Sequence, residues 1–166
     1  IEDANSKVLD LKAGARSTLA MGKITGDSAY FYHVGDSEIL YWNAHGGELY
    51  SSTPHSCSGH KVKAGVVTQE ESLTDPDRNI VNNMMGDEYI KIECTNGISV
   101  KKGHTILVGT DGLFDNLSHS KLTDLVGKGN FDKSFNEIVE ICKDQSENDW
   151  LKNDDIAFII VRKIEA

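Results

Sequence analysis

Three aspartates share one sequence context, since each lies where an apolar, strand-like run begins or ends. Asp36 interrupts a strand after YFYHV, Asp111 follows TILV, and Asp154 precedes IAFIIV. If these strands are neighbours, the carboxylates can converge at one edge of a sheet. Converging carboxylates repel one another and resist desolvation, and a divalent cation relieves both costs. An all-oxygen ligand set favours the hard cations Mg²⁺ or Mn²⁺ over zinc.

Such a cluster would have a definite chemistry. Two hard cations held close together can activate water for in-line attack on a phosphoryl group. The alternative is that the three acids are independent turn residues, because Asp and Gly are among the commonest turn formers. The types and spacing of the residues leave both interpretations open.

The composition bounds the kind of protein. The chain has 166 residues, 39% of them hydrophobic and 26% charged, as expected of one soluble globular domain. Its net charge is −9 and it has no Lys/Arg run, so we expect no nucleic-acid partner. No apolar run is long enough to span a membrane. Cys57, Cys94 and Cys142 are scattered without CxxC spacing, which favours a reducing, cytoplasmic location.

The periodicity predicts an α+β fold of antiparallel strands with helices packed outside. The pattern predicts strands at 17–24, 29–34, 38–42, 48–52, 89–94, 104–109 and 156–161. It predicts helices in 1–14, after the capping-box residue Thr68, from Ser118 or Ser120 to about 126, and at 133–145. Residues 53–66 and 146–155 are expected to be loops.

Two histidine-containing stretches are weaker candidates. The stretch from His55 to His60, HSCSGH, offers three soft ligands. Without a fourth ligand it is more typical of a polar loop than of a zinc site. The AHGG stretch at 44–47 is expected to be a hairpin turn, and His33 is expected to be structural.

Five segments in order along the chain carry a resemblance to one family. GTDGLFDNLS at 109–118 looks like the motif SDGL-x-D-x-L-S, and HVGDS at 33–37 resembles VGDS. DDIAFIIV at 154–161 resembles a closing D-N-I/V-T-V-V-V strand, and STLA at 17–20 lies where a G-S/T-T strand start is found. GVVTQEESLTDPDRN at 65–79 is similar to G-x-I-T-x-E-E-A-x-x-H-P-x-R-N. These are motifs of the PP2C (PPM) metal-dependent protein serine/threonine phosphatases of bacterial type.

The resemblance implies a fold and an activity. The fold would be an α-β-β-α sandwich of two packed antiparallel sheets flanked by helices. The activity would be hydrolysis of phosphoserine and phosphothreonine in proteins by a metal-activated water. Asp111 and Asp154 match the aspartates that hold the second core metal, and Asp36 matches a ligand of a third site. The intact domain would use two or three Mg²⁺ or Mn²⁺ ions on a phosphoprotein substrate.

The chain also departs from the family pattern. The opening acid and the DGHGG motif are absent, and the phosphate-binding arginine and the acid histidine are expected in the same missing region. Glu38 replaces the usual Arg after GDS, Asp155 replaces an Asn, and Ala157 replaces a Thr. We therefore expect residues 1–166 to form a single partial domain, incomplete at its N-terminus, with a flap-like segment at about 54–88. Alone it should be weakly active or inactive; the alternative is a non-catalytic PP2C-like module that regulates or binds a partner.

Overall fold

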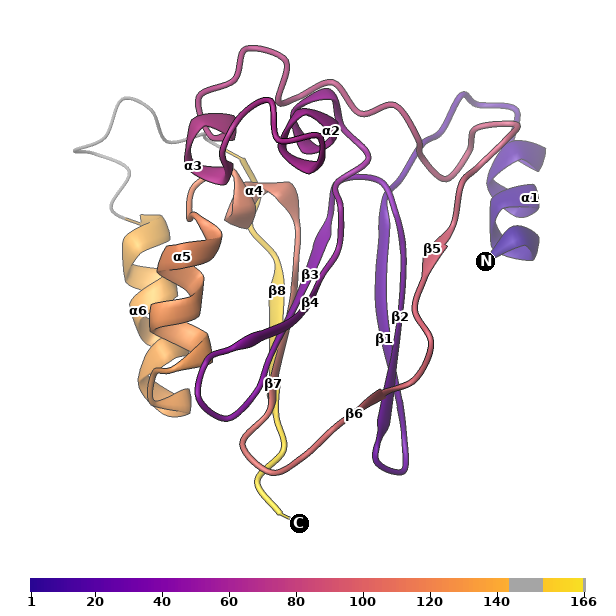
Figure 1. The fold of residues 1–166 in the computed structure, drawn as a ribbon. Helices are drawn as coiled ribbons and strands as arrows, with labels where there is room; N and C mark the ends of the chain where they lie inside the picture. The colour runs from indigo at the N-terminus through magenta and orange to yellow at the C-terminus, as the bar shows by residue number, and fades with distance from the viewer. Residues whose placement is uncertain (144–153, 166) are drawn as a thin grey trace.

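Two antiparallel β-sheets form the centre of the computed structural model, which describes residues 1–143 and 154–165 (Figure 1). One sheet, which we call the β3–β7 sheet, has the order β4-β3-β7-β8. The other, the β1–β2 sheet, has the order β1-β2-β5, and β6 also pairs with β2. The strands are β1 (Leu19–Thr25), β2 (Ser28–Val34), β3 (Glu38–Trp42), β4 (Glu48–Ser51), β5 (Glu93–Cys94), β6 (Ile98–Ser99), β7 (Thr105–Gly109) and β8 (Phe158–Arg162).

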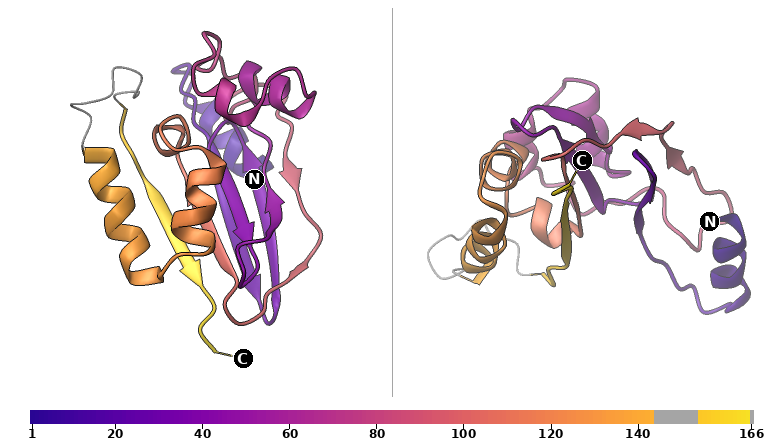
Figure 2. Two further views of the ribbon diagram at one scale, coloured as in Figure 1. Left: turned by 60° about the vertical axis from the view of Figure 1, so that its left-hand side comes forward. Right: turned by 90° about the horizontal axis from the view of Figure 1, so that it is seen from below.

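Helices flank the two sheets. They are α1 (Glu2–Asp10), α2 (Cys57–Lys63), α3 (Gln69–Ser72), α4 (Asp111–Phe114), α5 (His119–Leu122), the π-helical turn η1 (Thr123–Gly127) and α6 (Phe131–Lys143). Viewed along the strands, α5 and α6 lie on one flank and α1 on the opposite flank (Figure 2). The helices α2 and α3 lie over one end of the sheets (Figure 1). None of the described helices is long and apolar enough to cross a membrane.

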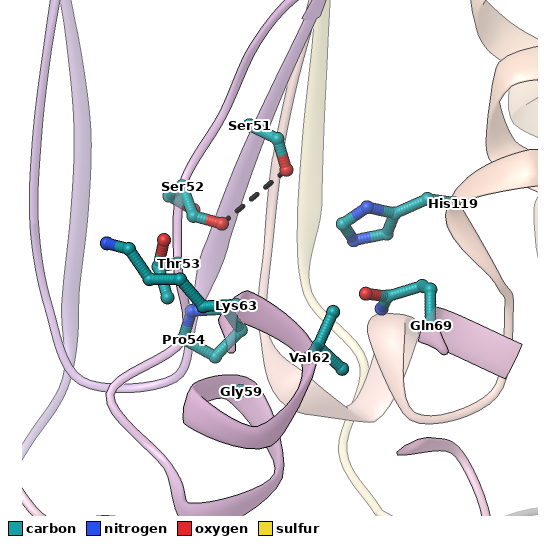
Figure 3. A pocket seen from close by; sticks show the side chains of 9 residues that line it. All are labelled: Ser51, Ser52, Thr53, Pro54, Gly59, Val62, Lys63, Gln69 and His119. Carbon is teal, nitrogen blue, oxygen red and sulfur yellow. Dashed lines mark hydrogen bonds between the residues drawn. The ribbon is translucent and has the colours of Figure 1, made fainter. Parts of the chain in front are cut away.

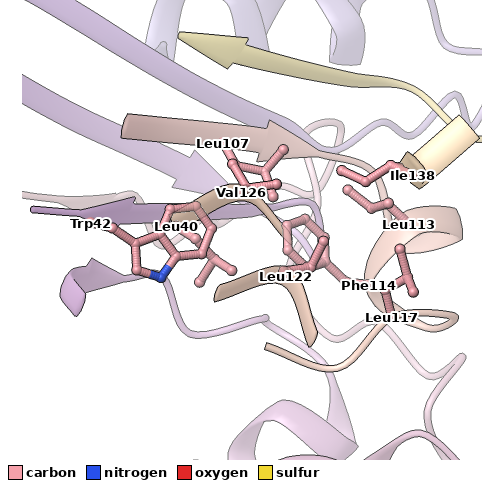
Figure 4. Packing of buried hydrophobic residues seen from close by; sticks show 9 residues of the cluster. All are labelled: Leu40, Trp42, Leu107, Leu113, Phe114, Leu117, Leu122, Val126 and Ile138. Atoms are coloured by element: carbon pink, nitrogen blue, oxygen red, sulfur yellow. The ribbon is translucent and has the colours of Figure 1, made fainter. Parts of the chain in front are cut away.

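Strand β3 supplies side chains to two separate cores, because successive residues of a strand point to opposite faces. Leu40 and Trp42 face the helices and pack in one cluster with Leu107 (Figure 4). Ile39 and Tyr41 face the other sheet and pack in a second cluster with Phe31. All five residues of β3 are buried. The central strands β3 and β7 therefore have apolar support on both faces.

The structure confirms the expected fold class and most of the expected elements. Thr68 caps α3 in a capping box, and the Ser118 hydroxyl accepts the amide of Lys121 at the start of α5. The AHGG stretch forms the expected turn between β3 and β4. The last two residues of the helix expected at 133–145, and most of the loop expected at 146–155, lie outside the described residues.

Several helix and strand boundaries predicted from the sequence were wrong. Residues 57–63, expected to be loop, form α2, because the Ser56 side chain accepts the amide of Gly59 and caps a helix start. The strand expected at 89–94 is reduced to Glu93–Cys94. The first helix ends at Asp10, before Gly14. The helix expected to run to about 126 continues beyond Leu122 only as the π-helical turn.

Candidate functional site

The strand register brings all three predicted aspartates to the same end of the β3–β7 sheet. Gly109 at the end of β7 pairs with Glu38 at the start of β3 and with Phe158 at the start of β8. Asp36 lies just before β3, Asp111 just after β7 and Asp154 shortly before β8. The strand ends that precede or follow the three aspartates therefore lie side by side, as expected. Helices α2 and α3 lie over the same end (Figure 1).

The segments that carry Asp111 and Asp154 lie side by side. The amide of Thr110 donates to the carbonyl of Ala157 at 2.9 Å. A Cβ atom on Gly112 would lie 2.4 Å from the carbonyl oxygen of Asp155. Only glycine allows this close approach of two backbones, which gives the Asp-Gly pair a role beyond that of a turn.

Two of the carboxylates are oriented by the amide of the next residue. Asp111 Oδ1 accepts the N–H of Gly112 at 3.0 Å, and Asp154 Oδ1 accepts the N–H of Asp155 at 2.8 Å. Such local bonds restrict the carboxylate rotamer without neutralising its charge. The donor chemistry at this end of the sheet therefore fits hard cations such as Mg²⁺ and Mn²⁺.

A compact three-ligand cluster lies elsewhere in the described part of the chain. It consists of His33, His55 and Glu93, whose ligand atoms all lie within 4.8 Å of one another. His55 Nδ1, however, accepts the N–H of Gly35 at 3.1 Å. A metal-bound histidine normally donates through its second nitrogen instead. The hydrogen-bond pattern at His55 therefore argues against a metal at this cluster.

A buried pair of side chains links β3 to α5. His119 Nε2 lies 2.9 Å from Glu38 Oε2, and both side chains are largely buried. Burial raises the pKa of Glu38, and the nearby His119 only partly opposes this. Burial lowers the pKa of His119, but the hydrogen bond and the charge of Glu38 outweigh it and raise that pKa above its ordinary value. Both shifts therefore favour the protonated form of the group concerned.

A groove of about 270 Å³ lies beside this pair, between the end of β4 and helices α2 and α3 (Figure 3). His119 and Gln69 line one side, and Val62 points between them and the β4 segment. The full lining is Ser51, Ser52, Thr53, Pro54, Gly59, Val62, Lys63, Gln69 and His119. Among the described residues no acid lines the groove, although the chain as a whole has a net charge of −9. Polar donors and one lysine thus face a space near the aspartates' end of the sheet.

A family model described as protein phosphatase 2C matches residues 2–153. The chain belongs to the protein phosphatase 2C family. A protein phosphatase 2C-type relative from Streptococcus pyogenes is 29% identical over 150 residues, covering 86% of this chain and 60% of that relative. The phosphatase PhpP from Streptococcus pneumoniae is 30% identical over 115 residues, covering 68% of this chain and 46% of PhpP. The chain thus spans 60% or less of the length of these two relatives.

Solved structures share the phosphatase 2C fold. The serine/threonine phosphatase of Streptococcus agalactiae matches with a TM-score of 0.77 at 24% identity, covering 99% of this chain and 67% of that one. The catalytic domain of the phosphatase PstP, in complex with two manganese ions, matches with a TM-score of 0.76 at 16% identity, covering 97% of this chain and 67% of that one. At these identities the likeness establishes the fold.

Sequence reasoning missed the polar support around the phosphatase 2C motifs. Glu38 was noted only as a departure from the family pattern, and His119 was not singled out. Their contact joins residues 81 positions apart, so no local pattern could reveal it. His55 was noted only as one end of the weak zinc candidate, and its bond to Gly35 likewise depends on the tertiary fold.

Proposed function

We propose that this chain forms part of a Mg²⁺- or Mn²⁺-dependent protein serine/threonine phosphatase in which Asp36, Asp111 and Asp154 hold the cations. Family membership and the bacterial phosphatase fold support the reaction class. The manganese ions of the PstP catalytic domain support the choice of cation. The observation that carries the proposal is the strand register, which brings the three acids to one end of the β3–β7 sheet.

The roles proposed for this chain's residues follow from their positions. Bound cations of this kind acidify water and neutralise charge on phosphoryl oxygens. Asp111 and Asp154 would hold one cation between the adjoining segments at Thr110 and Ala157. Asp36 would act with Asp111 at a further cation site. The amides of Gly112 and Asp155 would keep two of the carboxylates in fixed orientations.

The groove below α2 and α3 is the proposed place for the peptide next to the phosphorylated residue. Its lining supplies hydroxyl, amide and ammonium donors, which suit a polar peptide better than an apolar ligand. The phosphoprotein substrate and a cytoplasmic location belong to this proposal.

The 166 residues alone should have little activity. The sequence contains no DGHGG motif, and the resemblance implies that the aspartate of this motif bridges two metals. Mg²⁺ demands a near-complete octahedron, so a site without that ligand should bind it weakly. A chain that also carries an upstream DGHGG segment should be the active form.

The test is hydrolysis of a phosphothreonine peptide with Mn²⁺ by the full-length protein and its Asp111→Asn variant. The variant keeps the size of the side chain and its bond to the Gly112 amide but lacks the charge that the cations require. We expect a loss of about 100-fold or more in turnover, with an unchanged circular dichroism spectrum. Full activity in the variant would remove Asp111 from the mechanism. An inactive full-length protein that still binds phosphoproteins would favour the non-catalytic module.

A further inference from the structure

His55 lies where the two ends of the segment between β4 and β5 are joined by backbone hydrogen bonds. The carbonyl of His55 accepts the amide of Asn82 at 2.9 Å, and the amide of Cys57 donates to the carbonyl of Ile80 at 3.0 Å. Ser56 and Val81 form an isolated antiparallel bridge at the same place. Residues 57–80, which include α2 and α3, therefore leave and re-enter the body of the protein at one point, which we call the excursion base.

His55 also holds the turn that precedes Asp36. Its amide donates to the carbonyl of Gly35 at 2.8 Å, and its Nδ1 accepts the amide of Gly35 at 3.1 Å. One residue thus binds both backbone polar groups of Gly35. The side chain of His55 is 3% exposed, so water cannot readily replace the bond to Nδ1.

The opposite side of the turn is held by Thr18. Gly35 has a φ of +105°, and a Cβ atom on it would lie 2.5 Å from the Thr18 side chain. The hydroxyls of Thr18 and Ser37 are 2.7 Å apart. The turn that carries Asp36 is therefore fixed between Thr18 and His55.

The neighbours of His55 fix which ring nitrogen carries the hydrogen. Asn83 Oδ1 accepts the amide of Lys91 and Asn83 Nδ2 donates to the Lys91 carbonyl, each at 2.8 Å. This pairing sets the orientation of the amide, so the Asn83 Nδ2 group that lies 2.6 Å from His55 Nδ1 is a donor. Two donors face Nδ1, which must be the acceptor in a neutral ring. The hydrogen therefore lies on Nε2, on the side of Glu93 at 3.7 Å, and the His33 ring stacks on that of His55 with centroids 4.2 Å apart.

We propose that His55 is a positioning residue that sets the Gly35–Asp36 turn through Nδ1 and ties that turn to the base of the excursion. The position of the Asp36 carboxylate and that of α2 and α3 would then change together. This inference rests on the proposed function, because it takes Asp36 as a metal ligand. It assigns the cluster of His33, His55 and Glu93 a supporting role and no metal.

A matched pair of variants in the full-length protein isolates the Nδ1 contact. In His55→Asn the amide oxygen lies near the place of Nδ1 and can still accept the Gly35 amide. In His55→Gln the amide group reaches toward the place of Nε2 instead. Both variants lose the ring and leave a similar cavity, so a purely structural role would affect them alike.

The readouts are Mn²⁺ affinity and the separate values of kcat and KM on a phosphothreonine peptide. We expect His55→Gln to weaken Mn²⁺ binding about 10-fold or more, as is usual when support behind a metal ligand is lost, and His55→Asn to restore most of it. Amide exchange at Gly35 should accelerate in the Gln variant and stay slow in the Asn variant. Equal effects in the two variants, or no effect in His55→Gln, would overturn the proposal.

A third variant leaves the ring in place. In Asn83→Asp a carboxylate would face Nδ1, draw the hydrogen onto it and break its bond to Gly35, so we expect the same loss of Mn²⁺ affinity. Wild-type affinity in this variant would contradict the proposal.

Two further outcomes separate this inference from the proposed function. Unchanged Mn²⁺ binding in Asp36→Asn would overturn the assignment of Asp36, and the positioning role with it. A loss in Asp36→Asn combined with equal His55 variants would overturn the positioning role alone. Stoichiometric Zn²⁺ binding that is lost in His55→Gln but kept in Asp111→Asn would show that the histidine cluster is itself a metal site.

Discussion

The two sheets of this protein are supported in different ways. In the β3–β7 sheet every residue of β3 is buried, and helices cover the face opposite the second sheet. In the β1–β2 sheet the last five residues of β1 are exposed, and β5 and β6 have two residues each. The core next to β2 also contains the buried imidazoles of His33 and His55.

The three aspartates of the predicted metal site lie next to differently supported parts of the two sheets. Asp111 lies just after β7, a central strand that is packed on both faces. Asp154 lies shortly before β8, an edge strand whose Ile159 and Val161 are exposed. Asp36 lies in the turn that leads from β2 of one sheet to β3 of the other. Hydrogen bonds between Thr18 and Ser37 and between His55 and Gly35 hold this turn. The strand that leads to Asp111 is thus supported by apolar packing on both faces, and the turn that carries Asp36 is supported by hydrogen bonds.

The largest expected effect is on the helix-covered sheet. Trp42 is fully buried, and its Nε1 donates to Thr123 Oγ1 at 3.0 Å. Trp42→Ala should lower the free energy of unfolding by about 3–5 kcal/mol, because it removes a large core side chain and leaves a cavity. Urea unfolding measures this, with Trp42→Phe as the milder control. A loss below about 1 kcal/mol would mean that this core tolerates gaps and is not the rigid support described above.

A smaller effect on stability should come from the buried His55 as the pH changes. Burial and the nearby His33 lower the pKa of His55 to about 4, and burial also lowers that of His33. Below the ordinary histidine pKa of about 6.5 the unfolded chain binds a proton that the folded chain refuses, so stability falls as pH falls. From pH 7.5 to pH 5, His55 alone should cost about 2 kcal/mol.

Urea unfolding at the two pH values tests this, and His55→Asn should flatten the slope relative to wild type. Trp42→Phe keeps both His55 and the Glu38–His119 pair, so it should leave the slope unchanged. An equal slope in wild type and His55→Asn would mean that His55 is not the group that titrates.

The smallest effect is expected on β1. Ile24 is 49% exposed on an outer strand of the β1–β2 sheet. Ile24→Ala should change the free energy of unfolding by less than about 1 kcal/mol, as is usual for partly exposed positions. A loss comparable to that of Trp42→Ala would remove the contrast between the sheets.

Local patterns were sufficient where local physics decides the structure. The apolar runs at 38–42 and 104–109 predicted strands β3 and β7, and the Thr68 capping box predicted the start of α3. Alternation predicted a strand at 89–94, where most of the segment instead follows contacts such as the pairing of Lys91 with Asn83. Alternation cannot tell a strand from an extended segment that lacks a neighbouring strand.

Part of the candidate site could likewise be predicted from the sequence, and part could not. That acids lie at strand ends is visible in the sequence, and that Asp36, Asp111 and Asp154 share one end follows only from the strand order. The contacts of His55 with Gly35 and of Glu38 with His119 join distant parts of the chain. Such partners depend on how the sheets and helices pack, and no spacing in the sequence encodes them.

The most direct test is Mn²⁺ binding to the 166-residue chain by calorimetry, compared with its Asp111→Asn variant. The aspartates are present in this chain, so we expect weak but measurable binding that falls about 10-fold or more in the variant, while the fold and the Gly112 contact remain. Binding of equal strength in the two proteins would contradict a cation site at Asp111.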